Sequence, residues 1–506
     1  MAGMGYARIV TVFNSDAGSA MGEYRLTAAL FLRFLALIYF FAFVSIGVQI
    51  RGLAGEQGIL PFSAVLERYE AMSGIERYWN IPTLFWINAS DTALVGAAIL
   101  GCIFAVLLFF NFLPRIALIA QLLLYLSLVH AGQLFMNFQW DALLLEAGLL
   151  AIFLSPGSRY TVWLFRWLLF RFRFLSGLSK LVSLDPSWAN LTAVVYYFEV
   201  QPLPNWIAWY VNQLPDWLLA IGAGFTLFVE IVVPFMMFLP RPYRFVAGWL
   251  TIFLQIVILL TSNHNWFNLL TISLCLFLFD DQALRRIMPV RAESWLMKKP
   301  LPIGKEGRFY PVGMGMLGGL IVVVSMAQIA SLVTGQKVGG PIGEVVNQVE
   351  AFRVVNRYHV FPTMKTERIE LAISGSEDGY HWREYKFKYK PGDLDKYPEF
   401  VIPHQPRLDW QMWFVTIDPY FLPWFDNFLQ ALLENSPTVT DLLADNPFPD
   451  RAPRYLRVDV YRYHFTDWQT RARTGQWWTR EYLGPFRPLP YLARSPLASN
   501  GGHGHR

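Results

Sequence analysis

Long apolar segments alternate with short polar turns along the chain as far as residue 333. A helix needs about 20 apolar residues to cross the hydrocarbon core of a bilayer. The pattern predicts about nine transmembrane helices, of which the fourth and eighth are short for a span. They are expected at residues 26–48, 92–113, 116–135, 141–155, 160–178, 217–239, 245–260, 266–279 and 314–333.

The pattern changes beyond residue 344, where polar residues become frequent and apolar residues alternate with them. Alternation with a period of two is typical of strands that bury one face. Residues 411–417 read as a further buried strand, and residues 421–433 as one amphipathic helix. We therefore predict a soluble β-rich, sandwich-like domain with an added helix. The alternating strands are expected around Ile369, Leu371 and Ile373, and around Leu456, Val458 and Val460.

These two patterns divide the chain into an α-helical polytopic membrane domain, residues 26–333, and a β-rich domain, residues 344–490. Residues 1–25 lack the form of a cleavable signal peptide, so the first apolar segment is expected to remain as a span. The Gly/His-rich end, residues 491–506, is expected to be a disordered tail.

The composition agrees with a membrane protein. Hydrophobic residues make up 54% of the chain and charged residues only 16%, whereas soluble proteins carry about 25% charged residues. The 19 tryptophans suit belts at the membrane interfaces. The net charge of +5 comes from basic residues in short loops, so the pattern does not indicate a nucleic-acid partner.

The basic loops predict the orientation of the chain. Arg115, Arg159, and Arg241 with Arg244 lie in three tight turns, and the connector 281–313 carries further lysines and arginines. With nine spans, all four connections fall on the same side as the N-terminus. Positively charged loops face the cytoplasm. The β-rich domain is therefore expected on the non-cytoplasmic side.

Several ionisable residues lie inside the expected spans, where an unpaired charge is costly. We compared their depths with the rise of 1.5 Å per helical residue. The comparison predicts that Glu146 pairs with Arg173 or Arg171, and that Glu230 pairs with Arg166. Such pairs either hold helices together or mark a functional site, and the sequence leaves both interpretations open.

Lys180, Asp141 and His264 are expected at the outer ends of their spans, around one vestibule with Glu146. A desolvated lysine can act as a base, but an interfacial lysine can also simply extend to water. His264 lies in a polar loop that could equally cap two helices. No metal-ligand spacing and no nucleophile elbow, phosphate loop or dinucleotide fingerprint occurs, so no metal site and no catalytic motif is predicted.

Several segments spread over both domains share the pattern of one known family. They include 137–148 (NFQWDALLLEAG), 176–181 (SGLSKL), 185–188 (DPSW), 197–206 (YFEVQPLPNW), 263–270 (NHNWFNLL) and 356–364 (NRYHVFPTM). Together they resemble the lipase maturation factors. The resemblance implies a multi-pass membrane protein that, in animals, resides in the endoplasmic reticulum and helps dimeric secreted lipases to fold and assemble, with its C-terminal domain in the lumen. The short loops favour a bacterial member in the inner membrane, whereas a eukaryotic member is expected in the endoplasmic reticulum.

Residues 177–181 and 185–188 also resemble, more faintly, the membrane domain of vitamin K-dependent gamma-carboxylase. That resemblance implies Lys180 as a base toward a reduced quinone held in the outer vestibule. The alternative function is thus a quinone- or lipid-linked membrane enzyme that uses Lys180, Glu146, Asp141 and His264. A third hypothesis, a transporter, has no inverted repeat to support it.

The favoured hypothesis is a membrane-anchored maturation or folding factor for exported proteins, without enzymatic activity and without a cofactor. Its partners would be the lipid bilayer and an exported client, lipase-like if the family role transfers. Aromatic and polar residues where the β-rich domain is expected to meet the membrane domain are the candidates for client contact. They are Asn356, Tyr358, His359, Phe361, Tyr197 and Trp206.

Overall fold

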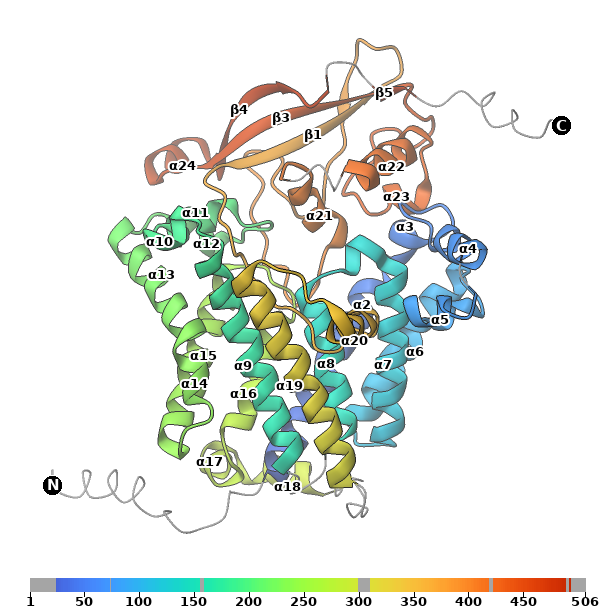
Figure 1. Cartoon of the computed structure of the whole chain (residues 1–506). Helices are drawn as coiled ribbons and strands as arrows, with labels where there is room; N and C mark the ends of the chain where they lie inside the picture. The colour runs from blue at the N-terminus through green and yellow to red at the C-terminus, as the bar shows by residue number, and fades with distance from the viewer. Residues whose placement is uncertain are drawn as a thin grey trace.

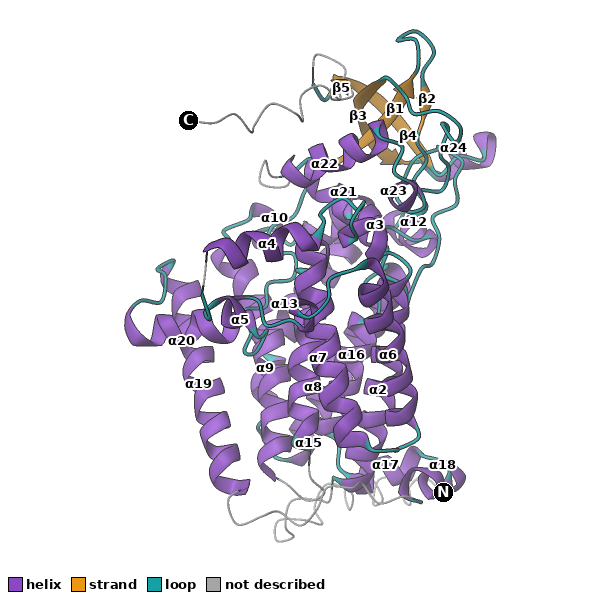
Figure 2. Cartoon of the chain, turned by 90° about the vertical axis from the view of Figure 1, so that its right-hand side faces the viewer, coloured by secondary structure: helices purple, strands orange, loops and turns teal. Residues whose placement is uncertain are grey.

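A bundle of long helices carries a small antiparallel sheet at one end in the computed structural model (Figure 1). The structure describes residues 24–72, 74–154, 159–298, 310–417, 422–487 and 491–492. The view in Figure 2 shows the same two layers, with helices running the length of the bundle and strands confined to its far end.

A helix lies at each of the nine expected spans. Five described helices are long and apolar enough to cross a membrane, and two sharply bent helix pairs would raise the number to seven. The protein is thus a multi-pass membrane protein, while nine spans remain a prediction because α8 is short and α9 carries charges. The helices are α2 (Arg25–Gly47), α6 (Asp91–Phe109), α7 (Pro114–Gly132), α8 (Gln139–Ile152), α9 (Arg159–Val182), α13 (Asp216–Ile231) with α14 (Val233–Met236), α15 (Arg241–Thr261), α16 (Phe267–Cys275) with η3 (Leu276–Leu278), and α19 (Tyr310–Thr334).

Shorter helices cover both ends of the bundle. The helices α17 (Asp281–Ile287) and α18 (Val290–Met297) lie at the end opposite the sheet (Figure 1). The remaining short helices of the membrane domain are α3 (Ile50–Ala54), α4 (Phe62–Met72), α5 (Arg77–Asn80), η1 (Leu84–Trp86), η2 (Gln133–Met136), α10 (Pro186–Ala189), α11 (Ala193–Val200) and α12 (Trp206–Asn212). The helix α20 (Gly340–Ala351) follows the last expected span.

The sheet has the strand order β2-β1-β3-β4, with β5 also paired to β3. Its strands are β1 (Arg368–Ser376), β2 (Arg383–Glu384), β3 (Tyr455–Phe465), β4 (Trp478–Pro485) and β5 (Tyr491–Leu492). The two expected alternating strands are confirmed as β1 and β3, and Leu371 lies opposite Val460. The described residues form this one sheet, so the second layer of a sandwich is not found among them. The strand β5 begins where a disordered tail was expected, and residues 493–506 lie outside the described residues.

The expected strand at residues 411–417 is wrong, because this segment forms the helix α21 (Arg407–Val415). Its side chains are buried on all sides between the sheet and the membrane domain, including those of Leu408, Trp410, Gln411 and Met412. A short segment that is buried all round shows neither helical nor strand periodicity. The expected helix at 421–433 is confirmed as α22 (Leu422–Leu433), and α23 (Pro437–Thr440) and α24 (Trp468–Thr474) complete the C-terminal domain.

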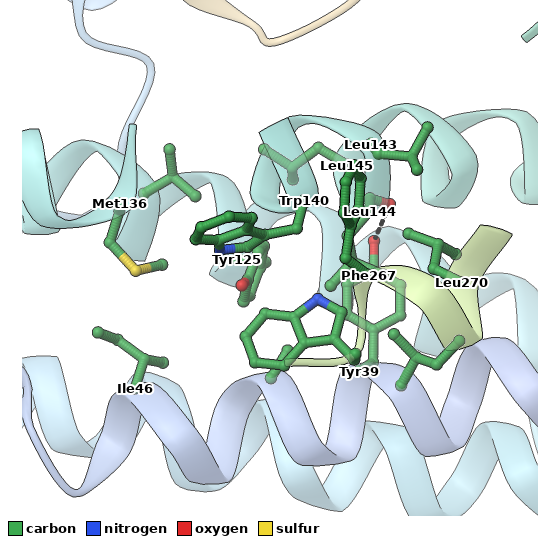
Figure 3. Close-up of a cluster of buried hydrophobic side chains, with 14 of the residues drawn as sticks. Tyr39, Ile46, Tyr125, Met136, Trp140, Leu143, Leu144, Leu145, Phe267 and Leu270 are labelled. Carbon is green, nitrogen blue, oxygen red and sulfur yellow. Dashed lines mark hydrogen bonds between the residues drawn. The ribbon is translucent and has the colours of Figure 1, made fainter. Parts of the chain in front are cut away.

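One hydrophobic core runs from the bundle into the C-terminal domain. Figure 3 shows part of it, where Tyr39 of α2 meets α8 and donates a hydrogen bond to the carbonyl of Leu144 at 3.2 Å. A Cβ atom at Gly148 would lie 2.0 Å from the Tyr39 hydroxyl, so only glycine allows this close approach of α2 and α8.

Acidic residues join the helices at the end opposite the sheet. The Asp281 carboxylate accepts hydrogen bonds from the backbone N–H groups of Leu26 and Thr27, both at 3.0 Å, at the start of α2. Asp280 pairs with Arg241 at 2.7 Å. The turn with Arg241 and the connector after Asp281 thus meet at one end, away from the sheet (Figure 1). Which end faces the cytoplasm remains a prediction from charge.

Candidate functional site at the domain junction

A buried ion pair joins the C-terminal domain to the membrane domain. Arg407, the first residue of α21, donates to both oxygens of Asp141, in the first turn of α8, at 2.6 and 2.7 Å. The Tyr125 hydroxyl donates to the same carboxylate at 2.6 Å. Both charged side chains are almost wholly buried. A buried charge is stable only when it is paired and hydrogen-bonded, so each domain depends on the other here.

A second buried carboxylate, Glu146, lies on α8 below Asp141. One of its oxygens pairs with Arg171, so the expected alternative partner is confirmed and the pair with Arg173 is wrong. The other oxygen accepts a hydrogen bond from the Tyr358 hydroxyl at 2.8 Å and two from Asn356 at 3.2 Å. Asn356 and Tyr358 are therefore buried supports of Glu146, which corrects their prediction as exposed client contacts.

The third carboxylate, Glu230 of α13, pairs with Arg173 at 3.1 Å and Lys180 at 2.7 Å. The expected pair with Arg166 is wrong, because Arg166 donates to the Tyr24 hydroxyl and the Phe277 carbonyl instead. Arg166 and Arg173 are seven residues, or about two helical turns, apart. The depth comparison placed the end of the fifth expected span level with the start of the sixth, and this misplaced Glu230 by about that distance.

The segment Val360–Met364 forms hydrogen bonds with the end of α9 and with the residues that follow it. Phe361 has a φ of 47°, a left-handed backbone conformation that is rare for a bulky residue and needs support from its surroundings. Four hydrogen bonds give that support. They run from Lys180 Nζ to the Val360 carbonyl at 2.6 Å, from Trp188 Nε1 to the Phe361 carbonyl at 3.1 Å, from Ser183 Oγ to the Pro362 carbonyl at 2.8 Å, and from the Met364 N–H to Asp185 at 2.9 Å.

Two further joints involve segments that the family resemblance singled out. Arg368, at the start of β1, donates to the carbonyls of Glu199, Gln201 and Pro202 at 2.6–3.0 Å. Asn263 exchanges hydrogen bonds with the backbone of the C-terminal domain through the Glu399 carbonyl and the Val401 N–H. The matching segments therefore meet in space and build the junction. Residues 368–370 also belong to the segments that resemble the family, but sequence reasoning did not predict the junction partners of Arg368 or Arg407, which lie 166 or more positions away.

An aromatic cavity of about 420 Å³ lies within this junction, and we call it the junction cavity. It opens beside the exposed residues Asn137, Thr363 and Lys365. Among the described residues, no hydrogen-bond partner is found for the buried Trp410 Nε1 or for either amide atom of Gln411. Its other walls include Phe138, Trp140, Phe267, His359, Phe361, Trp413 and Phe414.

A second cavity, of about 500 Å³, lies between α9, α13 and α15, and we call it the lateral cavity. Arg173, Lys180 and Glu230 contribute to it, together with many apolar side chains. The two cavities adjoin, because both are lined by His264, Phe267, Val360 and Phe361. His264 contacts the Tyr197 hydroxyl at 2.7 Å, and burial lowers the pKa of His264 to about 4, so its imidazole is neutral at pH 7.

The candidate catalytic residues do not share one site. Lys180 and His264 line the lateral cavity, whereas Asp141 and Glu146 are neutralised by arginines elsewhere. Across the described parts of the chain, no three His, Cys, Asp or Glu side chains are placed to hold a metal ion. Of the client-contact candidates, His359 and Phe361 line the junction cavity, Tyr197 lines the lateral cavity, and Trp206 packs half-buried beside Trp209.

Comparison with known proteins covers both domains. Residues 26–286 match the lipase maturation factor transmembrane domain, and residues 354–488 match the lipase maturation factor C-terminal domain. Lipase maturation factor 2 of Xenopus laevis is 33% identical over 93% of this chain and 83% of its own length. Lipase maturation factor 2 of Homo sapiens is 32% identical, with 94% and 84% covered, and lipase maturation factor 1 of Mus musculus is 32% identical, with 94% and 89% covered. No solved structure matches the chain. The chain belongs to the lipase maturation factor family.

Proposed function

We propose that this protein is a membrane-anchored factor that assists the folding and assembly of exported, lipase-like proteins, and that its junction cavity holds a segment of the client. The family supports a maturation role, since relatives over most of the chain are named lipase maturation factors. The proposal assigns no cofactor and no chemical step to the protein.

The junction cavity is the observation that carries this proposal. Phenylalanine and tryptophan side chains form a large part of its walls, and aromatic side chains supply large contact areas at binding sites. Gln411 adds one donor and one acceptor, both without a partner among the described residues. A peptide group offers the complementary acceptor and donor. In a partly folded client, an exposed apolar segment would pack against the aromatic walls, and its peptide groups would form hydrogen bonds with the Gln411 amide.

The orientation of the junction is part of the proposal, because an exported client must reach it. We propose that the sheet end is non-cytoplasmic, in the inner membrane of a bacterial cell or the endoplasmic reticulum of a eukaryotic one. The basic connections support this orientation. The helices α17 and α18 within the last of these connections lie at the opposite end of the bundle from the sheet (Figure 1).

Cysteine labelling in sealed membrane vesicles of known orientation tests the proposed sidedness. Tyr380→Cys, at an exposed position of the C-terminal domain, is expected to react with an impermeant maleimide only from the non-cytoplasmic side. Ile287→Cys, exposed at the other end, is the matched control and should react only from the cytoplasmic side. Reversed labelling of the two positions would refute the proposed meeting with exported clients.

A substitution in the junction cavity tests client binding without removing structure. Gln411→Leu removes the unpaired amide and keeps a similar side-chain volume, so the fold should be retained or slightly stabilised. Client binding should weaken by about 5- to 150-fold, the equivalent of about 1–3 kcal/mol for a lost buried hydrogen bond. The measurements are crosslinking of a co-expressed secreted lipase to the full-length protein and the lipase activity that is exported.

Gln121→Leu provides the matched control for that experiment. Gln121 is also a fully buried glutamine whose amide atoms find no partner in the described structure, but it lies on α7 and does not line the cavity. Its substitution should leave crosslinking and exported activity unchanged. Equal losses for both variants, or no loss for Gln411→Leu, would show that the junction cavity is not the client site.

A further inference from the structure

The lateral cavity has an outer wall on the surface of the helix bundle. Ile221 of α13 and Phe253 of α15 both line it, and more than half of each side chain is exposed on the bundle. The helix α15 is among those apolar enough to span a membrane. In a bilayer this surface contacts acyl chains, so the cavity is within reach of a hydrocarbon chain that enters between α13 and α15.

The inner end of the lateral cavity carries an excess of positive charge. Two cations, Arg173 and Lys180, share the single carboxylate of Glu230, and all three side chains are nearly fully buried. Arg173 Nε has no hydrogen-bond acceptor among the described residues. Gln255 and Asn268 bond to each other at 2.9 Å, yet Gln255 Nε2 and Asn268 Oδ1 also have no partner among the described residues. All of these residues line the cavity.

A buried excess charge is costly unless an opposite charge neutralises it. A carboxylate accepts hydrogen bonds from arginine, and its negative charge would balance the charge of this group. The Lys180 ammonium already donates to Glu230, Val360 and Ser176, so it would attract the carboxylate by its charge. The remaining walls are mostly apolar, and a volume of about 500 Å³ lies within the usual range for a small-ligand pocket. The ligand that fits both ends is therefore a single apolar chain with one acidic head.

We propose that the lateral cavity binds a long-chain fatty acid, with its carboxylate at Arg173 and Lys180 and its chain between α13 and α15. This site lies beside the proposed client site, and the two cavities share the lining residues His264, Phe267, Val360 and Phe361. The assignment does not depend on the identity of the client.

Photocrosslinking to the full-length protein in phosphatidylcholine nanodiscs tests the assignment. A palmitate analogue with a diazirine on its chain should label residues of α13 and α15 that line the cavity, as mapped by mass spectrometry. Unlabelled palmitate should compete at least about tenfold better than hexadecanol, which lacks the charge that the buried cations bind. Labelling outside the cavity, or equal competition by hexadecanol, would overturn the proposal.

A pair of glycine substitutions provides an independent test. A Cβ at Gly222, which lines the cavity, would meet only Val194 at 3.7 Å, so Gly222→Phe should fit and fill the cavity. Gly319→Phe on α19 points into open space and is the matched control. Cavity labelling should fall at least about tenfold in Gly222→Phe and stay unchanged in Gly319→Phe.

Analysis of the lipids extracted from the purified protein shows whether the acyl chain in the lateral cavity belongs to a free fatty acid or to a phospholipid. A free fatty acid retained by the unmodified protein and lost from Gly222→Phe supports the proposal. A stoichiometric phospholipid lost in the same way would replace the fatty acid as the occupant and overturn it. If Gly222→Phe fails to fold, the mapped labelling of the unmodified protein still decides the outcome.

Discussion

Replacing Arg407 with methionine is expected to loosen the C-terminal domain from the membrane domain and to destabilise the protein by about 3–5 kcal/mol. The substitution leaves the Asp141 carboxylate buried, and among the described residues the Tyr125 hydroxyl is then its one remaining partner. Burial alone would lower the pKa of Arg407, but the Asp141 carboxylate more than offsets this effect and raises it. The guanidinium is therefore charged at every physiological pH, and its loss removes a full counter-charge.

The loosening can be measured by thermal unfolding in detergent and by hydrogen exchange of β1 and β3. Arg285→Met is the control, since Arg285 forms an exposed ion pair with Glu293, and such pairs contribute only about 0–1 kcal/mol. The double variant Asp141→Leu/Arg407→Met leaves no unpaired charge and should recover much of the lost stability. If Arg407→Met unfolded and exchanged like the unmodified protein, the ion pair would not hold the junction.

The sequence predicts helices more reliably than the contacts between them. A run of apolar residues places a helix without reference to any other segment, and each expected span contains one. The pair of Glu146 and Arg171 could be predicted only as the alternative to Glu146 and Arg173. Depth counting finds the right level on α9, but Arg171 and Arg173 lie only about 3 Å apart along the helix axis and point to different faces, so it does not choose between them.

Contacts across long separations could not be predicted in this way. Asp141 and Arg407 are 266 positions apart, and nothing in either local pattern indicates the other. Asn356 and Tyr358 looked like exposed binding residues because polar and aromatic residues in a loop usually face water. Their partner, Glu146, lies 210 or more positions away in the membrane domain. A buried carboxylate that needs more donors than its own helix offers is the physical signal that could have indicated such a contact.

Replacing Glu230 with glutamine is expected to destabilise the membrane domain by about 3–5 kcal/mol, because it leaves two buried cations without a counter-charge. Arg173 and Lys180 both depend on this carboxylate. Thermal unfolding of the purified protein measures the effect. Asp216→Asn on the same helix α13 is the control, since Asp216 is exposed and its substitution should change little.

Lys180→Met separates a role in charge balance from a role as a base. It leaves Arg173 and Glu230 as a balanced pair, so it should destabilise the protein less than Glu230→Gln does. It should also weaken palmitate binding, because one of the two cations at the head of the lateral cavity is lost. A stable Lys180→Met protein that binds palmitate normally but no longer supports lipase export would indicate proton transfer by Lys180. If these charges hold the helices and their ligand, the Glu230→Gln protein should be less stable than the Lys180→Met protein. The Lys180→Met protein should also bind palmitate more weakly than the unmodified protein.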